Sequence, residues 1–198
     1  MTEYLYNYYK GIIRLEKIMK KALIITWEKY QDHELIYPYF SLKEHGYEVD
    51  IMANAVGKIW GSLGTHMPCT VEASIFNNEE NIDQFLDEYE ILVVPGGVKA
   101  LEKVRQEKGV LEFIRRWDSK KKTIFCICNG AQLLISAKIL KGRILSGYYS
   151  IDVDIENAGA IYDRSPVVVD DNIISCPHYD FMGAWMKTAF EVHENRNI

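Results

Sequence analysis

The stretch TIFCICNGAQLLISA, residues 123–137, carries the strongest fold signal in the chain. Its first part, Thr123–Ile127, is a short and almost wholly apolar run, which is typical of a strand buried on both faces. After Gly130, apolar residues recur at positions 133, 134, 137 and 140, the spacing of one face of a helix. The stretch therefore predicts a buried strand that turns sharply into an amphipathic helix.

Similar signals flank this stretch along the rest of the chain. We expect strands at 22–26, 48–52 and 90–94, helices at 33–46, 81–89, 100–122 and 179–192, and a β-hairpin around 170–172. Gly109 predicts a break within the helix 100–122. Strands that alternate with helices at this spacing imply βαβ units. The predicted fold class is therefore α/β, a doubly wound three-layer sandwich with a mostly parallel central sheet and helices on both faces.

The composition fits one cytoplasmic domain with an N-terminal extension. The 198 residues are 48% apolar and carry a net charge of −5, so we expect a real core and no binding to nucleic acid or anionic membranes. No apolar run reaches the length of a membrane span, and the opening MTEYLYNYYK lacks a secretory signal. The four irregularly spaced cysteines predict reduced thiols. We predict residues 1–19 as an extension, disordered or packed in an oligomer, and residues 20–198 as the domain.

Reactive and flexible residues follow three of the predicted strands. In a parallel sheet, the loops at the carboxyl ends of the strands meet at one edge, where ligands bind. Cys128 follows the strand 123–127, at a turn that would place its sulfur beside the unpaired N–H groups of the next helix and stabilise a thiolate. Those N–H groups could also hold an oxyanion. The alternative is a small apolar residue packed at a strand end, the interpretation we prefer for Cys126.

Two further groups could act on this sulfur. Glu34 lies near the start of the helix 33–46 in an apolar setting that disfavours its charge, so a protonated carboxyl could donate to the sulfur. The alternative is an acid placed in a first turn by the helix dipole. His178 follows the predicted hairpin and is the histidine that could serve as a base, or else an exposed loop residue. Trp27 follows the first strand and would either line or plug a pocket there.

With these residues in view, the chain resembles the PfpI family of intracellular cysteine peptidase-like proteins, glyoxalases and protein deglycases, part of the class I glutamine-amidotransferase-like superfamily. The resemblance covers residues 21–192 and rests on ELIYPYFSLKEHGYEVD, LVVPGG, ICNGAQLLISAKILKGR, ENAGAIY, PVVVDDNIIS and AWM, in this order. It implies a flavodoxin-like sandwich with Cys128 as nucleophile, Glu34 as the acid touching its sulfur, and Gly96 and Gly97 lining the oxyanion side with Gly130. It also implies a homodimer or higher oligomer, with Glu102 as a candidate at the contact between copies.

The chain departs from the family pattern at the site itself. The pattern Cys-His-Gly is replaced by Cys128-Asn129-Gly130, and an amide cannot take a proton at neutral pH. Asn129 could still orient a substrate by hydrogen bonding. The loop 175–180 lacks the arginine of the family and gains Cys176 and His178. Cys-His peptidase chemistry is therefore doubtful, and either His178 replaces the missing base or Cys128 works with Glu34 alone.

The leading functional prediction is a small-molecule enzyme, a hydrolase or lyase, in which Cys128 adds to a carbonyl or related carbon and Glu34 shuttles the proton. Hydrolysis, hydration and glyoxalase- or deglycase-type reactions are all compatible with it. The alternatives are a redox sensor or chaperone that uses an oxidisable Cys128, and an assembly partner without catalysis. We predict no nucleotide or other cofactor, because no phosphate-binding fingerprint is present, and no metal, because the spacing of Cys69, His66, Cys176 and His178 matches no known site.

Overall fold

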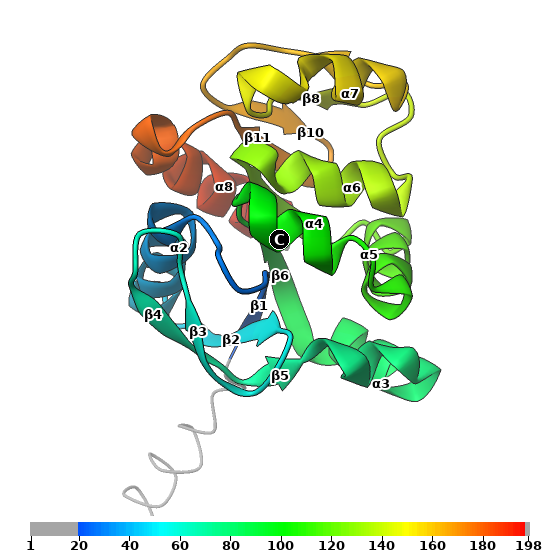
Figure 1. Cartoon of the computed structure of the whole chain (residues 1–198). Helices are drawn as coiled ribbons and strands as arrows, with labels where there is room; N and C mark the ends of the chain where they lie inside the picture. Colours follow the sequence, from blue (N-terminus) through cyan, green and yellow to red (C-terminus); the bar gives the residue numbers. More distant parts are fainter. Residues whose placement is uncertain (1–19, 197–198) are drawn as a thin grey trace, which may run out of the picture.

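The computed structural model describes residues 20–196 and shows a central sheet covered by helices on both faces (Figure 1). The prediction of an N-terminal extension at residues 1–19 lies outside the described residues. The order along the sheet is β10-β11-β7-β6-β1-β2-β5. All neighbouring strands are parallel except β10, which is antiparallel to β11. The predicted α/β sandwich with a mostly parallel sheet is therefore confirmed.

The strands of this sheet are short and mostly buried. Their bounds are β1 Lys21–Ile25, β2 Glu48–Ala53, β5 Val71–Glu72, β6 Tyr89–Val94, β7 Thr123–Ile127, β10 Val168–Asp170 and β11 Ile173–Cys176. Two small two-stranded sheets stand apart, β3 Gly57–Trp60 with β4 His66–Cys69, and β8 Ile144–Leu145 with β9 Ile161–Tyr162. The predicted hairpin around 170–172 is confirmed as β10 and β11, and Asp171 in its turn has a φ of 53°.

The helices divide between the two faces of the sheet. Helices α2 and α8 pack with the β3–β4 hairpin against one apolar cluster, while α3, α5, α6 and α7 pack against the other (Figure 1). Their bounds are α2 Asp32–Glu44, α3 Glu79–Glu88, α4 Val98–Val104, α5 Lys108–Ser119, α6 Ala131–Ala137, α7 Asp152–Asn157 and α8 Met182–Arg196, with 3-10 turns at η1 Ala73–Asn77, η2 Cys128–Gly130, η3 Tyr149–Ile151 and η4 Tyr179–Phe181. Within the described part of the chain, no helix is long and apolar enough to cross a membrane.

One local prediction was wrong. The helical stretch 100–122 is interrupted between α4 and α5, but Gly109 lies inside α5 and does not break it. A Cβ atom at Gly109 would lie 2.4 Å from the carbonyl oxygen of Phe76. The glycine therefore serves the close approach of α5 to η1, a tertiary requirement that local sequence cannot reveal.

Candidate active site

Cys128 sits at a sharp turn between β7 and α6. Its φ of 58° is in the left-handed region, which costs a non-glycine residue of the order of 1–2 kcal/mol. The N–H of Tyr148 donates to the Cys128 carbonyl oxygen at 3.2 Å and holds the turn from the other side. Because such strained residues persist where the surrounding structure fixes them, this position is a strong candidate for a functional residue.

Glycines allow the neighbouring backbone to approach this turn. A Cβ atom on Gly130 would lie 2.3 Å from the carbonyl oxygen of Val94, and one on Gly96 would lie 2.3 Å from Glu34 Oε2 and 3.0 Å from Cys128 Cβ. Gly97 has a φ of 111°, and a Cβ there would lie 2.7 Å from the Gln31 nitrogen. The three glycines are thus required for the loops after β1, β6 and β7 to meet, as the sequence predicted.

Glu34 reaches the turn from the first part of α2 and is completely buried. Its Oε2 accepts a hydrogen bond from the Gly96 N–H at 2.8 Å, while Oε1 has no nitrogen or oxygen partner among the described residues. Burial raises the pKa of the carboxyl to about 7, against opposing hydrogen bonds from Cys128 and Gly96. Since the Gly96 N–H is donated to Glu34, Gly96 positions the acid and does not supply an oxyanion donor.

The electrostatics of Cys128 correct one expectation. Burial raises the pKa of its thiol, the Glu34 charge raises it further, and the N–H of Asn129 lowers it less than these two raise it. The helix terminus by itself therefore does not hold a thiolate in the free protein. Because the pKa of the thiol is raised well above neutrality and that of the carboxyl to about 7, the pair keeps at least one proton at neutral pH, and the thiol carries it.

Asn129 is buried next to the sulfur. Its Oδ1 lies 3.5 Å from Cys128 Sγ, so the thiol can donate to the amide oxygen. The amide orients the S–H bond without exchanging protons. The structure thus places Cys128, Glu34 and Asn129 together, as the sequence predicted.

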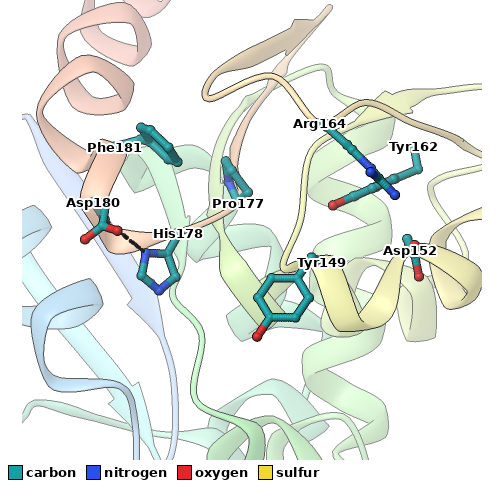
Figure 2. Close-up of a pocket in the computed structure, with 8 residues that line it drawn as sticks. All are labelled: Tyr149, Asp152, Tyr162, Arg164, Pro177, His178, Asp180 and Phe181. Carbon is teal, nitrogen blue, oxygen red and sulfur yellow. Dashed lines mark hydrogen bonds and ion pairs between the residues drawn. The ribbon is translucent and has the colours of Figure 1, made fainter.

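The other predicted residues lie at different distances from this centre. His178 does not hydrogen-bond to Cys128 within residues 20–196; its Nδ1 lies 3.1 Å from Asp180 Oδ2 (Figure 2). Its role as a base stays a prediction. Trp27 is partly buried and packs against both apolar clusters at the loop after β1. Glu102 is exposed on α4, and its role at a contact between copies also stays a prediction.

Sequence reasoning missed two residues that build the site. Tyr148 holds the Cys128 carbonyl, yet it is far along the chain and no local pattern marks it. Asp32 is buried at the start of α2, where it accepts hydrogen bonds from the N–H groups of Leu63 and Thr65 and from the Thr65 hydroxyl. It ties the β3–β4 hairpin to the helix that carries Glu34. An acid in a first turn was visible, but its partners were not.

Ligand groups for a metal are not gathered in this part of the molecule. Across residues 20–196, no three or more His, Cys, Asp or Glu side chains are arranged to hold a metal ion.

The structure combines a mostly parallel α/β sheet with a cysteine on a strained strand-to-helix turn and a buried glutamate beside it. The model of the DJ-1/PfpI family matches residues 20–192, and the chain belongs to this family. It is 39% identical to Deglycase PfpI of Pyrococcus furiosus over 84% of this chain and 95% of that protein. It is 34% identical to General stress protein 18 of Bacillus subtilis over 88% of this chain and 98% of that protein.

Solved structures agree with this fold. A two-domain protein of Anabaena variabilis, with DJ-1/ThiJ/PfpI-like and ferritin-like domains, superimposes with a TM-score of 0.79 at 26% identity, over 87% of this chain and 47% of that one. Schizosaccharomyces pombe DJ-1 superimposes with a TM-score of 0.75 at 19% identity, over 88% of this chain and 90% of that one. The flavodoxin-like sandwich is therefore shared with these proteins.

Proposed function

We propose that this protein is a DJ-1/PfpI-type enzyme in which the Cys128 sulfur adds to the carbonyl carbon of a small molecule. The observation that carries the proposal is the buried Glu34 carboxyl, which has a hydrogen bond to the Gly96 N–H and faces the sulfur on a strained turn. Similarity to a protein named a deglycase supports an enzymatic role.

The protonation of Cys128 and Glu34 supports the following first step: the thiol carries a proton and the carboxylate can accept it. Glu34 accepts the thiol proton as the sulfur forms a bond to the carbonyl carbon and the carbonyl π electrons move to oxygen. Glu34 then returns this proton to the new alkoxide, which gives a neutral hemithioacetal and restores the carboxylate. The N–H of Gly97 and the Asn129 amide are the groups available to orient the oxygen.

The fate of this adduct decides the overall reaction. If the substrate carbon carries a leaving group, loss of that group followed by attack of water gives hydrolysis. Loss of an amine from a carbonyl adduct would instead give a deglycase reaction, the activity named for the Pyrococcus furiosus relative. A dicarbonyl compound could instead be rearranged to a hydroxy acid. We propose the addition step that these reactions share; the release step depends on which groups the substrate carries.

A comparison of variants tests the proposal. Wild-type protein and Cys128→Ala are assayed with methylglyoxal and with methylglyoxal adducts of N-acetyl-lysine, by loss of substrate and by product analysis. Turnover is expected to fall by a factor on the order of 10⁴ or more in Cys128→Ala. Cys69→Ala, which removes another buried thiol in β4 away from the turn, is the matched control. Undiminished turnover by folded Cys128→Ala would end the proposal.

The same pair of groups favours one alternative, a redox sensor. A protonated Glu34 could donate a hydrogen bond to a sulfinate formed at Cys128 by two equivalents of peroxide, each of which is reduced to water. Peroxide titration followed by peptide mass measurement separates the two functions. Selective oxidation of Cys128 without turnover of any carbonyl compound would favour the sensor.

A further inference from the structure

A cavity of about 670 Å³ is open to solvent, and its lining includes neither Cys128 nor Glu34. One wall comes from the segment 149–164, around η3, α7 and β9, and the other from residues 177–181, between β11 and α8 (Figure 2). This volume is in the range of cavities that bind metabolites. The mechanism above does not use any of its lining.

The cavity is connected to the nucleophile through Tyr148. The Tyr148 N–H donates to the Cys128 carbonyl oxygen at 3.2 Å, and its hydroxyl donates to the hydroxyl of Tyr149, in the cavity wall, at 2.9 Å. The Tyr148 ring also lies 6.1 Å from the ring of His178, centroid to centroid. Because β7 and β11 are neighbouring parallel strands, the loops that follow them open at the same edge. A ligand in the cavity would therefore lie next to the turn that carries the sulfur.

Arg164 is the guanidinium in this wall, and it is unusual among the arginines of residues 20–196. It has no hydrogen bond and no ion pair with any residue of this range, and Figure 2 shows its side chain near that of Tyr162. The other arginines of the range each have a polar partner: Arg105 with Ser136, Arg115 and Arg116 with Glu112, Arg143 with Asp118, and Arg196 with Asp171. Arg164 is exposed at the wall of the open cavity, and a planar guanidinium without a partner is suited to a carboxylate or phosphate, which it binds through two parallel hydrogen bonds.

The Tyr149 hydroxyl adds a hydrogen-bond donor to the cavity wall beside the Arg164 guanidinium. The Tyr149 oxygen accepts from Tyr148, so its own proton is available for a ligand. The ring of His178 lines the same cavity, with its Nδ1 3.1 Å from Asp180 Oδ2 and 3.4 Å from the Asp180 backbone nitrogen. Arg164 and Tyr149 therefore offer donors to a ligand that carries acceptor oxygens.

Two carboxylates limit the charge of that ligand. Asp180 is engaged by His178 at 3.1 Å, and Asp152 accepts from the Val153 N–H at 2.8 Å while also lining the cavity. With one guanidinium and two carboxylates in the wall, a ligand with two negative charges would meet repulsion from Asp152 and Asp180. A singly charged carboxylate is the better match.

We infer that this cavity is a subsite for the carboxylate end of the substrate, with Arg164 as its specificity-determining residue and Tyr149 as a second donor. Combined with the addition step at Cys128, on which this inference rests, the substrate is a carbonyl compound that also carries one carboxylate, an oxo acid of metabolite size. Arg164 binds and orients this group and takes no part in proton transfer.

Binding in the absence of turnover tests the subsite. Cys128→Ser protein, which cannot form the hemithioacetal through sulfur, is titrated with 4-oxobutanoate by ligand-observed NMR and by calorimetry. Butanal, which has the same chain without the carboxylate, and butyl phosphate are the comparison probes. Adding Arg164→Gln is expected to weaken 4-oxobutanoate binding by about tenfold or more and to leave butanal binding unchanged. Arg115→Gln, which removes an arginine on α5 outside the cavity, is the matched control.

The outcomes separate this inference from the proposed function. Equal binding of 4-oxobutanoate with and without Arg164→Gln, or no binding of it at all, would overturn the carboxylate subsite even if Cys128 proves to be the nucleophile. Tighter, Arg164-dependent binding of butyl phosphate would overturn the choice of carboxylate. Arg164-dependent carboxylate binding together with normal turnover by Cys128→Ala would support the subsite and reject the mechanism.

Discussion

Asp32 and Glu34 lie two positions apart in the first turns of α2, and both are buried, yet their surroundings give them opposite properties. Burial raises the pKa of Asp32, but hydrogen bonds from the Thr65 hydroxyl and from the N–H groups of Leu63 and Thr65 lower it by more, so that the net shift of this pKa is downward. Glu34 has one N–H donor, from Gly96, and burial raises its pKa to about 7.

The difference teaches that burial alone does not decide the charge of an acid. The depth of burial and the number of donors together decide whether an acid is a fixed anion or a group that exchanges its proton near neutral pH. The Asp32 region, with its hairpin, is built for stability, while the Glu34 region keeps a carboxyl oxygen without a nitrogen or oxygen partner beside a sulfur. Four experiments can break or sharpen this comparison.

The largest expected effect is that of Glu34→Gln on turnover. The amide can still accept from the Gly96 N–H, but it cannot exchange the thiol proton, so kcat/KM is expected to fall by a factor on the order of 10³. Steady-state kinetics with the substrate found for wild-type protein measure it. Glu44→Gln, an exposed acid at the end of the same helix, is the control and should leave the rate unchanged. A rate within a factor of a few of wild type would remove Glu34 from the mechanism.

Asp32→Asn is expected to reverse the pattern, with a large effect on stability. An amide keeps one acceptor oxygen and places its NH2 group against the donors of either Leu63 or Thr65, and we expect the free energy of unfolding to fall by about 3 kcal/mol. Chemical denaturation measures this loss, and Asp154→Asn, an exposed acid on α7, should change it by less than about 0.5 kcal/mol. If Asp32→Asn is as stable as wild type, the hairpin clamp is not a stabilising contact.

The pH dependence of stability follows from the raised pKa of Glu34. Its pKa rises from 4.5 to about 7 on folding, so the folded state binds the proton more tightly and the free energy of unfolding falls as pH rises from 4.5 through 7. At about 1.4 kcal/mol per pKa unit, this loss amounts to about 3 kcal/mol. The lowered pKa of Asp32 acts at lower pH, where stability is lost as pH falls through its folded value, below 3.8.

The measurement compares the free energy of unfolding of wild type and of Glu34→Gln at about pH 5 and about pH 8, one value on each side of the Glu34 titration. The difference between the two proteins isolates Glu34, because His193, whose pKa is lowered by burial, titrates in both. Wild type is expected to lose stability relative to Glu34→Gln as pH rises. Parallel curves would mean that Glu34 keeps an ordinary pKa.

The smallest expected effect is that of Gly96→Ala, which presses on the Glu34 side of the comparison. The new Cβ would overlap Glu34 Oε2 and touch Cys128, so we expect a loss of about 2 kcal/mol in the free energy of unfolding. We also expect the stability of this variant to change less with pH than that of wild type. Gly183→Ala in α8, where a Cβ meets nothing within 4 Å, is the control and should be neutral or stabilising. Equal stability of the two variants would show that the loop after β6 yields without cost.

Much of the fold could be predicted from local pattern. Short apolar runs and helical spacing predicted β1, β2, β6 and β7 and the hairpin of β10 and β11, because burial on both faces demands apolar residues at every position of a central strand. Cys126 was predicted as a core residue and is fully buried in an apolar cluster. The role of Gly109 was predicted wrongly because its reason, the carbonyl of Phe76, lies on another element.

The candidate site was predicted in its residues but not in its electrostatics. Cys128 and Glu34 could be named because a turn between strand and helix and an acid at a helix start are visible in the sequence, while Asn129 was named from its place in the family pattern. The protonation of the sulfur could not, because burial and the Glu34 charge outweigh the helix terminus only once the loops have met. Tyr148 and Arg164 could not be named from the sequence. Tyr148 matters because its N–H contacts the Cys128 carbonyl, and Arg164 because it has no polar partner among residues 20–196.

The sequence by itself determined the alternation of strands and helices, and with it the edge of the sheet at which a site must form, because hydrophobic period and glycine turns act over a few neighbouring residues. Only the tertiary structure decided that Glu34 and Gly96, 62 residues apart, share a hydrogen bond and that Asp32 does not compete for it. Proton affinity depends on solvent exclusion and on the count of nearby donors, and both are properties of the packed molecule.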